Sequence, residues 1–195
     1  MDKNLIGLLS IPLTVAVTVP YLVNIWKGKI QPHIFTWIIW GVTGGISATA
    51  GLAADAGPGA WVQWADALSC LSIAILAGFK VKLNLTRSEI LAFVGALSAL
   101  PVWIATKDPL YAVVIVTSID TIGYYPTFRK SWAAPYQEAL INYVIANPLW
   151  LLSVLATETI SFTTICFPIT IFLMNTLLIF YLLWRRRVVR QGISA

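Results

Sequence analysis

Two acidic residues lie within long apolar stretches of this sequence, and they are its first candidates for chemistry. Asp66 is the one charged residue of residues 56–79, and Asp120 is the one charged residue of residues 109–128. If these stretches cross a membrane, a carboxylate at mid-depth costs about 3 kcal/mol, so it needs a compensating role. We expect Asp120 to carry a proton or to bind substrate, and Asp66 to bind a polar ligand. The alternative for both is structural, as a hydrogen bond that holds helices together.

Two amides and two tryptophans could complete a binding site for a polar solute. Asn175 lies deep in the last apolar stretch, and Asn147 precedes Pro148, whose ring frees a backbone carbonyl near mid-depth. Trp37 and Trp40 are three residues apart, on one face of a helix, where their rings can stack on a sugar or a cation. We predict that these two amides and two tryptophans contact substrate. The alternatives are interhelical hydrogen bonds for the amides and an aromatic interface belt for the tryptophans.

Proteins that change shape also need positions at which a helix can bend. Pro20, Pro126 and Pro148 lie inside apolar stretches, and the pair Gly44-Gly45 lies in the middle of another. A proline inside a helix removes a backbone hydrogen bond and kinks the helix. We expect these five residues to act as hinges, although bent helices also occur in membrane proteins that do not move.

No motif for catalysis or metal binding accompanies these residues in the sequence. His33 is the one histidine, and Cys70 and Cys166 are isolated within apolar stretches. Neither a metal-ligand spacing nor a disulfide framework results. We therefore expect no enzymatic activity, no cofactor and no bound metal, and we expect His33 to be solvated at the inner mouth of the protein.

The composition places these residues in a membrane protein. Hydrophobic residues make up 58% of the 195 residues, charged residues make up 11%, and the mean hydropathy is +0.81. So few charges cannot coat a soluble globule, which excludes an ordinary cytosolic enzyme, a disordered chain and a secreted disulfide scaffold. We predict an all-α membrane protein, because spanning helices need about 20 apolar residues. The seven predicted spans are 4–26, 30–54, 56–79, 90–106, 109–128, 139–157 and 159–184.

The distribution of basic residues predicts the orientation of these spans. Seven spans place the chain ends on opposite sides, and only Lys3 and Lys107 fall on the side of the N-terminus. The other 11 of the 13 lysines and arginines fall on the opposite side, which the positive-inside rule assigns to the cytoplasm. We expect a multi-pass protein with its N-terminus outside and its C-terminus cytoplasmic. This explains the basic isoelectric point without nucleic acid as a partner.

An internal repeat divides the seven spans into two triplets. Val19–Pro32 and Tyr125–Pro135 each contain a proline, then an aromatic and basic segment, and then a second proline that opens the next helix. Between the two triplets, Gly45 corresponds to Pro148, Asp66 corresponds to Asn175, and Thr14 corresponds to Asp120. We predict a first three-helix repeat at 1–79, an inner loop and linker helix at 80–106, a second repeat at 107–184 and a cytoplasmic basic tail at 185–195. A linker that crosses once makes the repeats parallel, which is a known plan of transporters.

These features resemble the PQ-loop/SWEET (MtN3-like) family of seven-helix small-solute transporters. The resemblance covers nearly the whole chain: the helix count, the outside N-terminus, the linker helix and the basic segment after each proline. The Pro-Gln pair that names the family is Pro20-Tyr21 in the first half and Pro126-Thr127 in the second. The resemblance implies a 3+1+3 fold and a polar residue on the third helix of each triplet that faces a cavity.

The expected function is transport of a small polar solute, such as a sugar or an amino acid, by alternating access, with proton coupling at Asp120 as an option. Two other functions fit the same fold: a ligand-binding or receptor module that does not transport, and an accessory subunit of a membrane complex. A membrane enzyme that acts on lipid is disfavoured by the missing catalytic motif. The expected partners are the solute and the lipid bilayer, and a homo-oligomer is left open.

Overall fold

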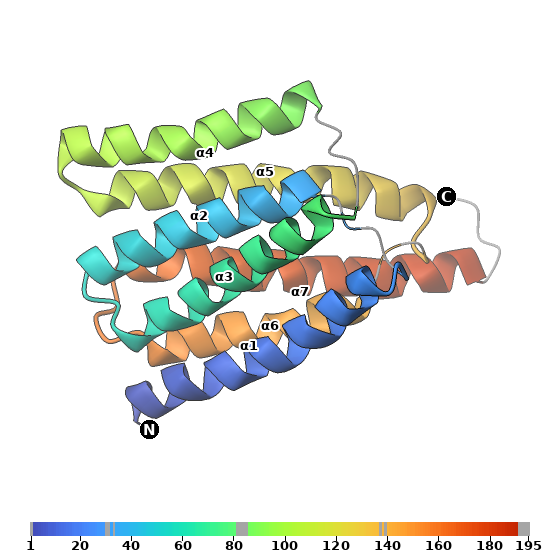
Figure 1. Ribbon diagram of the computed structural model, residues 1–195, viewed down its shortest axis with the longest axis horizontal. Helices are drawn as coiled ribbons and strands as arrows, with labels where there is room; N and C mark the ends of the chain where they lie inside the picture. The colour runs from blue at the N-terminus through green and yellow to red at the C-terminus, as the bar shows by residue number, and fades with distance from the viewer. Residues whose placement is uncertain are drawn as a thin grey trace.

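The computed structural model describes residues 2–29, 32, 34–80, 86–136, 138 and 140–190. The side chains of Pro126 and Lys130 lie outside this description, as do His33, with its predicted place at the mouth, and the end of the tail, 191–195. Within the described ranges the chain forms seven α-helices (Figure 1). They are α1 (Lys3–Trp26), α2 (Ile34–Ala53), α3 (Pro58–Gly78), α4 (Arg87–Thr106), α5 (Pro109–Ala133), α6 (Leu140–Ala156) and α7 (Phe162–Arg190).

Most of these helices have the length and composition of membrane spans. In the described part of the chain, α1, α2, α3, α4 and α7 are long and apolar enough to cross a membrane. The helix α5 has 25 residues, and α6 is a shorter apolar helix of 17 residues. The protein is therefore an all-α, multi-pass membrane protein, as the composition predicts. Membrane crossing by α5 and α6 stays a prediction.

The helix ends follow local sequence signals. Asp2 caps the first turn of α1, and Thr86 and Glu89 form a reciprocal capping box at the start of α4. Such caps satisfy backbone N–H groups that have no partner within the helix. The last helix differs from its predicted span, because α7 continues to Arg190 instead of ending at Trp184. The first part of the predicted basic tail is thus helical.

We describe α1–α3 and α5–α7 as two groups of helices, with α4 at the side of the molecule. Helix α3 packs against both α1 and α2, and α7 packs against both α5 and α6. Helix α4 packs against α5 and α2, at the edge of the molecule in Figure 1. Apolar side chains from α2, α5, α6 and α7, among them Ile46, Val113, Trp150 and Phe167, form the largest buried cluster where the groups meet.

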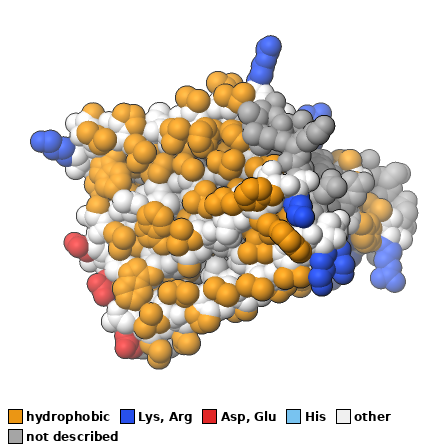
Figure 2. Space-filling view, viewed as in Figure 1, with side chains coloured by type: hydrophobic (Ala, Val, Ile, Leu, Met, Phe, Trp, Pro, Cys, Tyr) orange, Lys and Arg blue, Asp and Glu red, His pale blue; other side chains and the backbone are white. Residues whose placement is uncertain are grey.

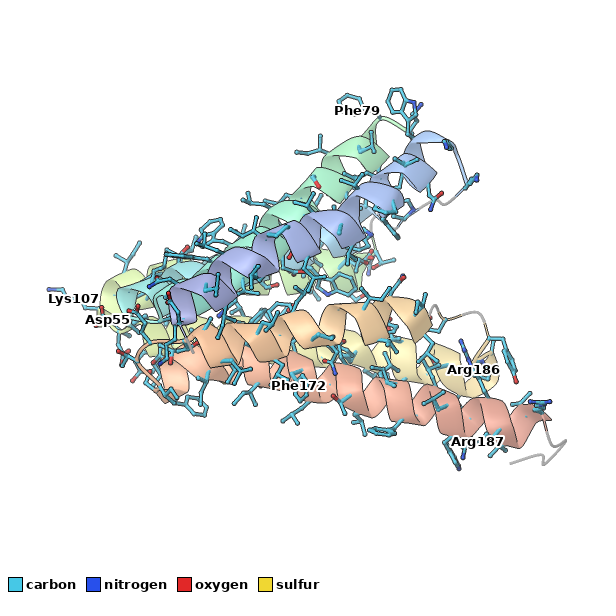
Figure 3. The ribbon with its side chains drawn as sticks, turned by 90° about the horizontal axis from the view of Figure 1, so that it is seen from below. Asp55, Phe79, Lys107, Phe172, Arg186 and Arg187 are labelled. Atoms are coloured by element: carbon cyan, nitrogen blue, oxygen red, sulfur yellow. The ribbon has the colours of Figure 1, made fainter. Side chains whose placement is uncertain are left out.

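The two groups of helices converge at one end of the molecule and diverge at the other. Figure 3 shows them close together at the end that carries Asp55 and Lys107, and apart at the end that carries Phe79 and Arg186. We call these the converged end and the splayed end. The N-terminus of α1 lies at the converged end, and the C-terminus of α7 lies at the splayed end (Figure 1).

Charged side chains gather at the two ends, with apolar side chains between them. On the face that Figure 2 shows, acidic groups lie at the converged end and most of the basic groups lie at the splayed end. The long middle part of this face is covered mainly by hydrophobic side chains. This is the surface that a bilayer requires, because the bilayer core offers no partner for charges. Which end faces the cytoplasm stays a prediction.

Candidate solute-binding cavity

A cavity of about 590 Å³ lies between the two groups of helices. Residues from every helix except α4 line it. It extends to the splayed end, where Asn24 near the end of α1 and Glu138 before α6 belong to its lining. Its volume falls within the range of small-molecule sites, about 300 to 1,000 Å³.

The two acids that the sequence predicts within the membrane both line this cavity, from opposite groups of helices. Asp120 on α5 is only 6% exposed, and its Oδ1 atom has no hydrogen-bond partner. Asp66 on α3 accepts a weak hydrogen bond from Cys70 Sγ, at 3.8 Å from its Oδ2 atom. The two carboxyl groups are near enough to interact electrostatically. The sequence predicts both acids at membrane depth, and the fold places them in the same cavity.

Two hydroxyl groups near Asp120 on the same helix, those of Ser118 and Tyr124, do not satisfy its free oxygen. The Ser118 hydroxyl donates to the carbonyl of Val114 on its own helix, at 2.7 Å. The Tyr124 hydroxyl donates instead to Asn175 Oδ1 on α7, at 2.7 Å. Asp120 does interact with the Thr43 hydroxyl on α2, so an interhelical contact remains as the structural alternative, although Oδ1 itself has no partner.

Asn175 lies on the cavity wall, as predicted, and its partner there is Tyr124. Both residues line the cavity, and their hydrogen bond joins α5 to α7. A similar hydrogen bond joins α1 to α3, between the hydroxyls of Thr18 and Ser69, which also line the cavity. In each group, a side-chain hydrogen bond at the cavity wall thus joins the first helix to the third.

The predicted tryptophans form an aromatic wall together with a tyrosine. Trp37 and Trp40 on α2 pack edge to face with their ring centroids 5.3 Å apart. The ring of Tyr21 on α1 lies 5.2 Å from that of Trp37, and all three residues line the cavity. Trp37 lies in the first turn of α2, but all three rings face the cavity, which favours ligand contact over an interface belt.

Other predicted site residues lie away from the cavity surface. Asn147 is not among the lining residues: its Nδ2 atom donates to Thr176 Oγ1 at 2.8 Å. The neighbouring residues Ala146 and Leu149 line the cavity instead, and substrate contact by Asn147 stays a prediction. Of the predicted hinges, Pro20 and Gly44 line the cavity, whereas Gly45 and Pro148 do not. Pro126 lies within α5, and its hinge role stays a prediction.

The cavity is closed toward the converged end by a buried chain of polar contacts. We call this chain the outer seal, because the sequence predicts that the N-terminus, which lies at this end, is outside. Ser47 on α2 donates to Gln63 Oε1 on α3 at 2.9 Å, and Gln63 Nε2 lies 3.4 Å from Ser153 Oγ on α6. Ser153 Oγ donates in turn to the carbonyl of Gly59 at 2.9 Å. A methyl group on Gly59 would lie 2.6 Å from the Ser153 carbonyl oxygen, so this close approach of α3 and α6 requires glycine.

Loop contacts reinforce the outer seal at the surface. The Lys3 ammonium donates to the carbonyl oxygens of Thr157 and Glu158, at 2.8 and 3.2 Å. The Glu158 backbone N–H donates to the Ala56 carbonyl at 3.0 Å. The beginning of α1 and the loop before α3 are thereby tied to the loop between α6 and α7.

Sequence reasoning missed several lining residues whose position a helical projection gives. Ser69 and Cys70 lie three and four residues after Asp66, so they share its face of α3. Glu138, which precedes α6, also lines the cavity and accepts a hydrogen bond from Tyr143 at 3.0 Å. No such projection predicts the partner of a side chain on another helix, because that depends on how the helices pack.

In comparisons with known proteins, no family model, no curated protein and no solved structure matches this chain. Within the described part of the chain, no three His, Cys, Asp or Glu side chains form a group that could hold a metal ion. What the site can do therefore follows from its own side chains: acceptor oxygens, aromatic faces and hydroxyls around an enclosed space at membrane depth.

Proposed function

We propose that this protein is a carrier that moves a small polar solute across the membrane by alternating access. The observation that carries the proposal is the cavity of about 590 Å³, which is lined by two acids at the predicted membrane depth. This cavity reaches one end of the molecule and is sealed toward the other end. A receptor needs a site, but it does not need one between two groups of helices that separate at one end and meet at the other.

The proposal includes two parallel three-helix repeats, α1–α3 and α5–α7, with α4 as the linker. In each proposed repeat the third helix packs against the first and the second. In the proposed repeat, α1, α2 and α3 correspond to α5, α6 and α7. The contact between α2 and α5 then corresponds to the contact between α6 and α1. The contact between α3 and α6 corresponds in the same way to the contact between α7 and α2. Two halves related by a twofold axis would pair their helices in this way, which supports the repeat.

Aromatic and basic contacts at the splayed end support the same relation. The Lys80 ammonium lies 4.2 Å from the ring centroid of Trp26, and the Arg185 guanidinium lies 4.3 Å from that of Trp132. Each contact joins the end of the first helix of a triplet to the end of its third helix. Trp26 and Trp132 stand at equal distances after Pro20 and Pro126 along the chain.

Hydrogen bonds at the cavity refine the register of the repeat. Thr18–Ser69 and Tyr124–Asn175 both join residues 51 positions apart, in the first and third helices of a triplet. In this register the counterpart of Asn175 is Ser69. The sequence comparison predicted Asp66, which lies one helical turn before Ser69. We propose the PQ-loop/SWEET family on this repeat and on the linker helix.

In the mechanism that we propose, the structure represents the state that faces the cytoplasm. The basic residues of the splayed end make this the cytoplasmic side by the positive-inside rule, so the N-terminus lies outside. Solute enters from the splayed end and contacts Asp66, Asp120 and Asn175. To release solute outside, the outer seal must part while the splayed ends approach, with Pro20 and Gly44 at the cavity as bending points.

Flux measured in proteoliposomes tests this function. Cys70 lines the cavity, so in a Cys166→Ser background a bulky thiol reagent on Cys70 should block the path. We expect the protein to accelerate entry of at least one solute from a mixture of labelled hexose, amino acids and small amines, and the reagent to abolish that entry. Uptake by Cys70→Ser in the same background, whatever its rate, should not respond to the reagent.

A protein that binds one of these solutes without accelerating its entry would contradict the carrier and favour the receptor. Entry that the reagent does not affect in the presence of Cys70 would place the path outside this cavity.

A further inference from the structure

Building on the proposed function, we infer that the solute is a small organic cation. Its ammonium or guanidinium group would lie between Asp66 and Asp120, and its apolar or flat part would lie against Tyr21, Trp37 and Trp40. The inference concerns only the chemical class of the ligand, and it can fail while the carrier function stands.

The charges on the cavity wall are all of one sign. In the described part of the chain, the charged residues that line the cavity are Asp66, Asp120 and Glu138, and neither lysine nor arginine belongs to the lining. The nearby arginine Arg186 directs its guanidinium to the backbone carbonyls of Pro135 and Glu138, at 3.0 and 2.7 Å. An anionic solute would find repulsion and no fixed cation, which excludes anions as the favoured class.

Asp120 supplies the observation that points to a ligand. Its side chain is 6% exposed and lines the cavity, and its Oδ1 atom lacks a hydrogen-bond partner. An ionised carboxylate can only accept hydrogen bonds, and a buried one is costly unless it is paired. The printed contact of Asp66 among the described residues is the weak one with the Cys70 thiol, at 3.8 Å. Asp120 also interacts with the Thr43 hydroxyl on α2, but a hydroxyl does not balance the charge of a carboxylate. A bound cation would satisfy Asp120 Oδ1 and balance the charge of both acids.

The aromatic wall complements this charge. The rings of Tyr21, Trp37 and Trp40 are mutually tilted or perpendicular, so they offer faces in more than one direction to the cavity. Aromatic faces attract cations, and quaternary ammonium groups in particular are bound by several rings at once. A sugar would also stack on these rings, but it would not compensate two carboxylates. The combination of acids and rings therefore favours an organic cation over a neutral solute.

A pair of isosteric probes tests the charge without any mutation of the acids. Choline and 3,3-dimethyl-1-butanol have the same shape, and only choline carries a charge. In the purified Cys166→Ser protein, each probe is tested at equal concentration for protection of Cys70 against a small uncharged thiol reagent, with agmatine as a guanidinium probe. We expect choline or agmatine to slow the reaction of Cys70 at least about fivefold more than the neutral alcohol does, because only they pair with the acids.

Matched variants then locate the effect. Asp120→Asn and Asp66→Asn should each remove the difference between choline and its isostere, while Asp55→Asn at the converged end should keep it. Asp55 is exposed and lies outside the cavity lining, so this control changes net charge without changing the site.

Equal protection of Cys70 by choline, agmatine and the neutral alcohol would overturn the inference, and so would no protection by any of them. This result comes from the protein with both acids intact, so it does not depend on whether the variants fold. A hexose or neutral amino acid that protects Cys70 and crosses the bilayer while the cations do neither would also overturn it, and would leave the carrier function intact. Protection by a cation that never crosses the bilayer would support the ligand class and contradict the carrier.

Discussion

Tyr124 and Asn175 meet at the wall of the cavity, where the phenol hydroxyl donates to Asn175 Oδ1 at 2.7 Å. This hydrogen bond joins α5 to α7 and fixes which amide atom can reach a solute: Oδ1 is engaged, so the NH₂ group remains as donor. Thr18 and Ser69 make the similar link between α1 and α3. Each of these bonds joins the first and third helices of a group, so we expect motion between the groups, rather than within them, to open and close the cavity.

Removal of the Tyr124 hydroxyl should impair transport more than stability. Tyr124→Phe keeps the ring but frees Asn175 to rotate in the cavity. Interhelical hydrogen bonds in membranes contribute about 0.6 to 2 kcal/mol, so we expect uptake of the solute identified in proteoliposomes to fall about 3- to 30-fold. Tyr125→Phe is the matched control, because Tyr125 is 67% exposed on the same helix. Equal uptake by both variants would show that the Tyr124–Asn175 contact does not shape the site.

A methyl group at Gly59 should weaken the outer seal. Gly59→Ala would press against the Ser153 carbonyl and separate α3 from α6 at the converged end. We expect a membrane-impermeant thiol reagent added outside to reach Cys70 several times faster than in the parent protein. Gly123→Ala is the control, since an added methyl at Gly123 has no neighbour within 4 Å. An unchanged rate for Gly59→Ala, in a folded protein, would mean that this contact does not limit opening.

Proton coupling is tested at Asp120. Asp120→Asn preserves shape but cannot take up or release a proton, so uptake driven by a pH gradient should be abolished in the folded variant. Uptake in proteoliposomes with and without an inward acid gradient measures this, with Asp55→Asn as the control that keeps the response. If the acid gradient accelerates uptake by the Asp120→Asn variant as much as uptake by the parent protein, Asp120 does not couple transport to protons.

The orientation can be tested independently of transport. A tag after Ala195 should be protected from protease in intact cells, because 11 of the 13 basic residues fall on the side of the C-terminus. Permeabilised cells should expose the tag. Cleavage in intact cells would reverse the assignment, and the structure would then represent the state that faces outward.

The fold was predictable to the extent that it depends on hydrophobic runs and helix caps. The apolar stretches around Asp66 and Asp120 became α3 and α5 with nearly the predicted starts, because long uncharged runs are stable only as helices in a bilayer. The end of α7 was not predicted, since Arg185–Arg190 lacks a helix breaker and the sequence has no signal that separates a helical from an irregular basic tail.

The site was predictable only by depth along each helix. Asp66, Asp120 and Asn175 were singled out because polar groups at membrane depth are costly, and all three line one cavity. Asn147 satisfies the same criterion, yet it bonds to Thr176 on α7, because rotation of α6 about its axis decides which side chain faces the cavity. That rotation comes from packing between helices, which the spacing of residues along one chain does not encode.

The most direct measurement is the reaction of Cys70 from each side of the membrane. In the Cys166→Ser protein, an impermeant trimethylammonium methanethiosulfonate reagent is added to right-side-out and to inside-out vesicles. The account predicts reaction from both sides, faster from the cytoplasmic side, because the same cavity opens to each in turn. Alternating access would be contradicted if Cys70 reacts from one side only, and still does so when a transported solute is present and in the Gly59→Ala variant.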